Sequence, residues 1–135
     1  MLKKVWIGIL LIFILSLADT ATGQDVPSGK WWYNKNVVES LNLTQKEIRK
    51  LDQLYAKSHR KLIKLKNAVE REQFELDELL GEKTVDDAKV RKQFKRLESA
   101  RTDLADERLG FVIGVRGIIG AERFQQLKTS YKKWR

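Results

Sequence analysis

The stretch that decides the fold is residues 43–80, LTQKEIRKLDQLYAKSHRKLIKLKNAVEREQFELDELL. It opens with a helix-start signal, because Thr44 can cap a helix and Glu47 can close a capping box with it. Apolar residues then recur at steps of three and four, which is the spacing of a helix with one packed seam. We therefore predict a single helix over residues 45–80, about 54 Å long at a rise of about 1.5 Å per residue. Gly81 follows and is suited to a left-handed C-cap.

A helix of this length needs a second helix along its side, from the same chain or from a partner, because it is too long to fold around a small compact core. Residues 85–116 carry a second, weaker apolar seam, and we predict Thr84 as the N-cap of that helix. The charges alternate in blocks: residues 46–66 hold eight basic and two acidic side chains, residues 67–82 hold six acidic and one basic, and residues 89–101 hold six basic and one acidic. An antiparallel hairpin brings opposite blocks together and places residues 103–107 beside residues 58–62.

Shorter segments flank this hairpin. The aromatic run Trp31, Trp32 and Tyr33 cannot all be buried by one helix face. We expect one or two of these rings to anchor the segment on the long helix, and a binding role is the alternative. Residues 34–41 are typical of a short helix, and Gly120 begins a last helical segment. The sequence thus predicts an all-α fold, with a long antiparallel helical hairpin and short N- and C-terminal helices.

Residues 109–119, LGFVIGVRGII, are apolar on all sides and contain three glycines. Gly110 and Gly114 are four residues apart, a spacing that would let another backbone approach closely. A buried helix end is one interpretation of this segment. The other is an exposed apolar patch at Phe111, Val112 and Ile113 that contacts a partner or client.

The N-terminus predicts export. Residues 1–23 have the layout of a secretory signal peptide: a basic start, an apolar run over residues 5–17 and then small polar residues. Ala21 and Gly23 fit the small-residue rule, so we place cleavage before Gln24; an uncleaved N-terminal anchor is the alternative. Residues 24–30 are then a flexible lead-in, and residues 31–135 form one helical domain.

Composition limits the kinds of site and binding partner that such a protein can have. The chain of 135 residues has no cysteine and a formal net charge of +9. Disulfides, thiolate metal sites and cysteine nucleophiles are thereby excluded. Because an exported chain does not meet nucleic acid, its basic charge favours anionic surfaces, acidic or unfolded polypeptides, or the exported face of a membrane protein. Contact with the membrane itself is expected only through an uncleaved signal segment.

Residues 31–127 resemble the Spy/CpxP family of periplasmic proteins, which includes zinc-resistance-associated proteins and heavy-metal sensors. Two Leu-Thr-x-x-Gln motifs mark that family, and each opens a helix. The first motif is present as Leu43, Thr44 and Glu47, with Glu in place of Gln. The second is degenerate and consists of Ile119, Gly120 and Arg123, so that Gly replaces the capping Thr and Arg replaces Gln.

The resemblance implies a four-helix protomer that pairs as an antiparallel, cradle-like homodimer. It also implies a periplasmic location. Two activities follow from it as alternatives: ATP-independent chaperone activity, or control of an envelope-stress or metal-responsive system by docking on the periplasmic domain of a sensor protein.

The sequence offers little material for a metal site or for catalysis. His59 is the only histidine, there is no cysteine, and the only methionine is the initiator. A transition-metal site usually needs several nitrogen or sulfur ligands. We therefore expect no metal and no cofactor; the weak candidates are His59 with Asp103, Asp106 or Glu107. No nucleophile triad, phosphate loop or paired-carboxylate cleft is visible, and we do not expect an enzyme.

The leading hypothesis is a periplasmic chaperone-like protein that binds clients in two ways. Basic side chains attract acidic or unfolded chains from a distance, and apolar side chains then hold exposed hydrophobic segments. The predicted basic contacts are Arg49, Lys57, Arg60 and Lys64. The predicted apolar contacts are Trp31, Trp32, Phe111, Val112 and Ile113.

Overall fold

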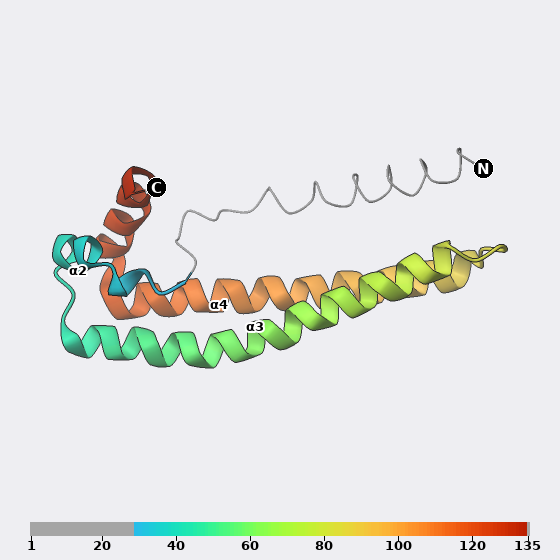
Figure 1. The fold of residues 1–135 in the computed structure, drawn as a ribbon, viewed down its shortest axis with the longest axis horizontal. Coiled ribbons are helices and arrows are strands. Elements are labelled where there is room, and N and C mark those ends of the chain that lie inside the picture. Colours follow the sequence, from blue (N-terminus) through green and yellow to red (C-terminus); the bar gives the residue numbers. More distant parts are fainter. Residues whose placement is uncertain (1–28, 135) are drawn as a thin grey trace.

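The protein is described here by a computed structural model that covers residues 29–134. The predicted signal peptide lies outside the described residues. The described part consists of a 3-10 turn and three helices: η2 (Trp31–Tyr33), α2 (Lys35–Leu41), α3 (Gln45–Leu80) and α4 (Asp87–Trp134). Helices α3 and α4 lie side by side and run in opposite directions over most of their length (Figure 1). The predicted all-α fold with a long antiparallel hairpin is confirmed.

The start of α3 forms as the sequence predicts. The Thr44 backbone N–H donates to Glu47 Oε1 at 3.0 Å, and the Glu47 backbone N–H donates to Thr44 Oγ1 at 3.1 Å. This is a complete capping box, which satisfies two backbone donors that the first helical turn leaves unpaired. The predicted C-cap is wrong, because Gly81 is right-handed (φ −81°, ψ −9°) and its N–H donates to the carbonyls of Asp77 and Glu78. The helix therefore ends in a tightened last turn.

The start of α4 differs from the prediction by two residues. Asp86, and not Thr84, provides the cap: its Oδ1 accepts a hydrogen bond from the Lys89 backbone N–H at 3.2 Å, and its carbonyl accepts one from Val90. The physical reason is the same one that favoured Thr84, since a short side-chain oxygen can accept from a free amide, and a carboxylate adds a favourable interaction with the helix dipole. Thr84 lies within the connection between the helices.

A glycine divides α4 into two straight parts. Gly120 has φ 83° and ψ 165°, a conformation that is available to glycine at little cost and strained for other residues. Residues 87–119 pair with α3, and residues 121–134 turn sharply away and lie beside α2 (Figure 1). We call residues 121–134 the C-terminal arm. The prediction that Gly120 begins a last helical segment is confirmed, although the preceding helix extends beyond residue 116.

Side-chain contacts fix the register of the hairpin. Lys61 Nζ lies 3.7 Å from Glu107 Oε2, which places residues 103–107 beside residues 58–62 as predicted. Nearer the tip, Gln93 Nε2 donates to the carbonyl and to the carboxylate of Glu72, at 2.9 and 2.7 Å. In the described part of the chain, Lys61–Glu107 is the one ion pair that joins α3 to residues 87–119. The charge blocks thus lie beside each other without forming a ladder of direct contacts.

The core is concentrated at one end of the hairpin, which we call the base. There η2, α2 and the C-terminal arm pack on the paired helices, and nine buried residues form one cluster: Trp31, Trp32, Val37, Leu41, Leu43, Leu51, Val115, Ile119 and Leu127. Toward the opposite end, the tip, two helices alone bury only a narrow seam. Phe74 (65% exposed) and Phe94 (45% exposed) remain in solvent there.

Candidate functional site

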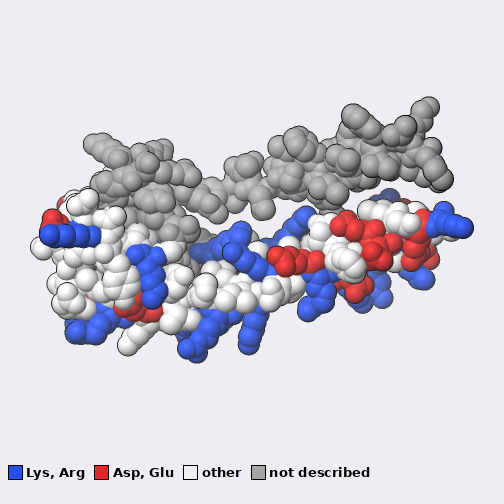
Figure 2. Space-filling view, in the orientation of Figure 1, with Lys and Arg blue, Asp and Glu red and all other residues white. Residues whose placement is uncertain are grey.

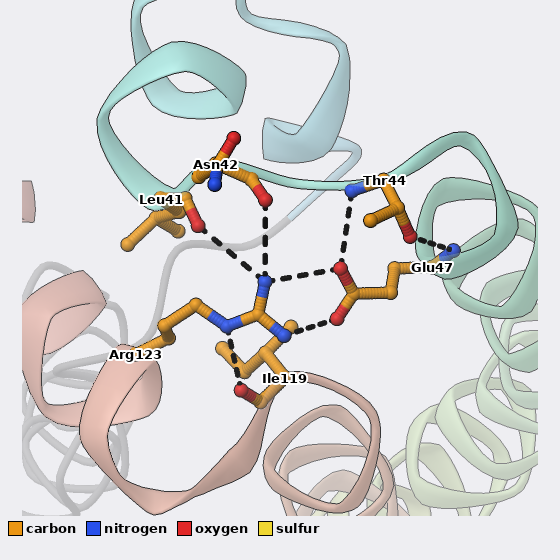
Figure 3. A network of polar contacts seen from close by, with 6 residues as sticks. All are labelled: Leu41, Asn42, Thr44, Glu47, Ile119 and Arg123. Atoms are coloured by element: carbon orange, nitrogen blue, oxygen red, sulfur yellow. Dashed lines mark hydrogen bonds and ion pairs between the residues drawn. The ribbon is translucent and has the colours of Figure 1, made fainter.

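The two motif segments meet at the base through Arg123 and Glu47 (Figure 3). Arg123 Nη1 donates to Glu47 Oε1 at 3.0 Å, and Nη2 donates to Glu47 Oε2. The same guanidinium donates from Nε to the Ile119 carbonyl at 2.9 Å and from Nη1 to the carbonyls of Leu41 and Asn42, at 3.4 and 3.5 Å. One side chain of the C-terminal arm therefore joins the end of α2, the start of α3 and the end of the first part of α4. We call this network the clasp.

The clasp holds Glu47 in its ionised form. The hydrogen bonds from Arg123 lower the pKa of this carboxyl from 4.5 to about 2, with smaller contributions from the Thr44 backbone and hydroxyl, and burial opposes the change. Both side chains are partly shielded, with exposed fractions of 16% for Glu47 and 29% for Arg123. Paired planar hydrogen bonds between guanidinium and carboxylate are among the stronger polar contacts in proteins. Glu47 is thus ionised at neutral pH, which is the form that the clasp requires.

The tryptophans of the aromatic run are packing anchors. Trp31 and Trp32 are buried in the base cluster, and their rings meet edge to face with centroids 5.4 Å apart. Trp32 Nε1 donates to Asp52 Oδ1 at 2.9 Å, which ties η2 to α3. Tyr33, the third ring of the run, is 59% exposed. Neither predicted tryptophan contact is available on the surface in this conformation, and within the run only Tyr33 is accessible.

The predicted basic contacts share one exposed side of α3. At 3.6 residues per turn, the steps of eight, three and four residues between them keep all four within an arc of about 80°. None is buried, and they point away from the seam formed by Leu51, Ser58 and Leu76. Figure 2 shows Lys and Arg side chains projecting along α3 near the base and Asp and Glu gathered toward the tip. We call the following four residues the basic stripe: Arg49, Lys57, Arg60 and Lys64.

The predicted apolar contacts are divided by the fold. Phe111 and Val112 are half-buried, and Phe111 packs against the base cluster with its ring 6.3 Å from that of Tyr55. Ile113 is 61% exposed, and the neighbouring Leu109 is also exposed. At Gly114 an added Cβ would lie 2.8 Å from a Leu54 methyl group, so this glycine permits a close approach between the helices. Gly110 has no such neighbour within 4 Å.

The weak metal candidates are not brought together as a ligand set. His59 is exposed and stacks on the Tyr55 ring, with centroids 5.1 Å apart and planes 13° apart. Glu107 is engaged with Lys61. Within residues 29–134, no group of three or more His, Asp or Glu side chains is close enough to hold a metal ion. In the same part of the chain, no helix combines the length and the apolar character that crossing a membrane requires.

Residues 36–126, more than half of the chain, match the family described as heavy-metal resistance. The chain belongs to this heavy-metal resistance family. It is the Spy/CpxP-like family that the sequence resembles, and its members are typically periplasmic and generally not enzymes. No curated protein and no solved structure matches the chain.

Within this family member, the clasp joins the two positions at which the motifs carry Gln. Glu47 and Arg123 occupy those positions, and their contact spans 76 residues of sequence. The motifs, taken as two separate helix starts, do not predict the contact between Arg123 and Glu47. The signal was present, because both motifs depart from Gln, one to an acidic and the other to a basic residue, as an ion pair requires.

Proposed function

We propose that this protein is a periplasmic, ATP-independent chaperone-like protein that holds unfolded or acidic polypeptides on α3. The observation that carries the proposal is the basic stripe: four cationic side chains lie on one exposed side of a helix whose base packs against η2, α2 and the C-terminal arm. Long-range attraction to acidic segments follows from this arrangement, and added salt weakens it because the screening length is about 8 Å at 0.15 M salt.

Apolar contacts beside the stripe would give short-range binding. Ile63 is 47% exposed and directly precedes Lys64, and Phe74 is exposed further along the same helix. Each exposed apolar side chain offers a weak contact for an unfolded segment, since burying apolar surface releases about 25 cal/mol per Å². Ile63 and Phe74 take the role that the sequence assigned to Trp31 and Trp32.

A homodimer belongs to the same proposal. The base half of α3 is basic and the tip half is acidic, so two copies placed antiparallel would set opposite charges against each other. Such a partner would also cover apolar surface near the tip, including Phe94. Sedimentation of the chain from Gln24 to Arg135 tests this point: a single species of monomer mass at all concentrations would contradict it.

The main test is suppression of client aggregation without ATP. The chain from Gln24 to Arg135, which contains every described element, is mixed near stoichiometry with a denatured client, and light scattering is followed at low and high salt. The test variant carries Gln at all four residues of the basic stripe. The matched control carries Gln at four exposed basic residues near the tip, Lys89, Lys92, Lys95 and Arg96.

We expect the unchanged protein and the tip control to suppress scattering at low salt, and the stripe variant to lose most of this effect. Absence of suppression at any ratio would contradict the chaperone proposal. Equal loss in both variants would show that net charge, and not the stripe, attracts the client.

A metal-responsive or stress-responsive regulator that docks on the periplasmic domain of a sensor is the second candidate. The description of the family favours it, together with the exposed position of His59. With one histidine per chain, a site would need ligands from a second copy or from the partner. A change in oligomer size with zinc or copper that is lost in His59→Ala would support this candidate; an unchanged size would leave only metal-independent docking.

A further inference from the structure

An exposed ammonium group lies between two tyrosine rings near the base of the molecule. Lys30 Nζ is 5.5 Å from the centroid of the Tyr33 ring and 5.3 Å from that of the Tyr55 ring. Both distances are within the range in which a cation is attracted to an aromatic face. Asp52 Oδ1 is 4.0 Å from the same nitrogen. Two rings and one carboxylate therefore surround a single positive charge.

The walls of this arrangement are fixed by contacts that do not involve Lys30. Tyr33 Oη donates to Asp52 Oδ2 at 2.5 Å, and Trp32 Nε1 donates to the other oxygen of the same carboxylate. The hydrogen bond from Tyr33 contributes most to lowering the pKa of the Asp52 carboxyl, and the one from Trp32 contributes next. Both favour the negatively charged form of Asp52. The Tyr55 ring is held between Trp32, at 5.7 Å, and His59, at 5.1 Å. The rings and the carboxylate would thus keep their places if Lys30 moved away.

Lys30 itself is held only weakly. Its side chain is 47% exposed, and its distance to Asp52 is at the limit for an ion pair. The residue before Lys30 is Gly29, which has φ 85°. A Cβ added at Gly29 would meet no described atom within 4 Å, so the chain is loosely packed there. In contrast to the buried indole of Trp32, the Lys30 side chain meets no contact within residues 29–134 that prevents it from leaving into solvent.

We propose that Tyr33, Tyr55 and Asp52 form a cation slot that holds Lys30 in the free protein and accepts a lysine side chain of a bound polypeptide when Lys30 leaves. The slot complements the basic stripe, because it takes the opposite charge and lies on another part of the surface. Lys30 is then an internal competitor, present at the millimolar effective concentration typical of a short tether. Its removal makes the slot available to other ammonium groups.

The experiment uses the chain from Gln24 to Arg135 with Lys30→Ala and a small probe, Nα-acetyl-lysine methylamide. The ring resonances of Tyr33 and Tyr55 and the indole N–H of Trp32 are followed by NMR during the titration. Nα-acetyl-norleucine methylamide, which has the same aliphatic stem without the ammonium group, is the ligand control. Lys35→Ala is the matched protein control, because Lys35 is also an exposed lysine but lies near Glu39.

We expect saturable shifts of the three resonances in Lys30→Ala, with an affinity at least about fivefold higher than in the unchanged protein or in Lys35→Ala. The norleucine probe should produce no saturable shift, and Asp52→Asn added to Lys30→Ala should abolish binding. If Lys30→Ala alters the helical circular dichroism, Lys30→Gln is titrated under the same criteria.

Equal affinity with and without Lys30, or an equal response to both probes, would overturn the proposal. The outcome is separate from that of the chaperone proposal, because neither probe is a denatured client and the basic stripe is unchanged in every variant.

Discussion

Replacing Arg123 by Gln tests the clasp most directly. The substitution shortens the side chain, removes its charge and leaves an amide of the kind that the family motif carries. The Thr44–Glu47 capping box remains, since it does not involve Arg123. The expected consequence is that the C-terminal arm loses its polar link to α2 and α3, while Leu127 still packs in the base cluster.

The expected loss of stability in Arg123→Gln follows from the pKa of Glu47. A change from 4.5 to about 2 sets an upper bound of about 3 kcal/mol on the stability gained above pH 4.5, of which Arg123 supplies the largest part. Solvent screening at the partly exposed pair reduces this value. We expect Arg123→Gln to lower the free energy of unfolding by about 2 kcal/mol at pH 7. Because the folded-state pKa is depressed, this contribution is present above about pH 4.5 and is lost as the pH falls toward 2. The difference between the two proteins should therefore shrink across that window.

Urea unfolding, followed by circular dichroism at pH 7 and at several values down to pH 2.5, measures both effects. A double-mutant cycle with Glu47→Gln isolates the pair: the double variant should be more stable than the sum of the two single losses predicts. Arg116→Ala, at an exposed arginine of the same helix, is the control and should change stability little. Additive losses, or a difference between the proteins that is the same at pH 2.5 and pH 7, would refute the reasoning.

Three further predictions concern stability and use the same unfolding assay. Gly117→Ala should stabilise the protein by about 0.5–1 kcal/mol, because the site is helical and has room for a Cβ. Gly120→Ala should destabilise it by about 1–3 kcal/mol, because Gly120 has a positive φ. A more stable Gly120→Ala than Gly117→Ala protein would contradict the bend at Gly120. Ser58→Ala should be neutral or stabilising by up to about 1 kcal/mol, since the buried Ser58 hydroxyl has no partner in the described structure; a clear loss would reveal a hidden hydrogen bond. Trp32→Ala should cost about 3–5 kcal/mol, and an unchanged midpoint would rule out its role as an anchor.

The start and length of α3 could be read from residues 43–80 because the signals are local. A capping box depends on residues three apart, and a packed seam repeats every three or four residues, so neither needs knowledge of distant parts of the chain. The hairpin register was also accessible, because folding the chain about the turn at residues 81–83 sets opposite charge blocks beside each other, and Lys61–Glu107 confirms this register. The exact start of α4 was harder to predict from the sequence. Thr84 and Asp86 can both cap a helix, and the residues nearby do not decide between them.

The tertiary structure alone decided the base and its surface. Gly120 permits a bend, but its direction is set by the packing of Leu127 among residues from η2, α2 and α3. That bend brings Arg123 to Glu47. On the part of α4 before the bend, Phe111 packs inward against the base cluster and Ile113 remains in solvent. These outcomes depend on contacts between residues far apart in sequence, and their energies are settled only when the helices meet. The sequence by itself determined the helices and their pairing; the packing of the flanking segments determined which charges pair and which apolar side chains remain exposed.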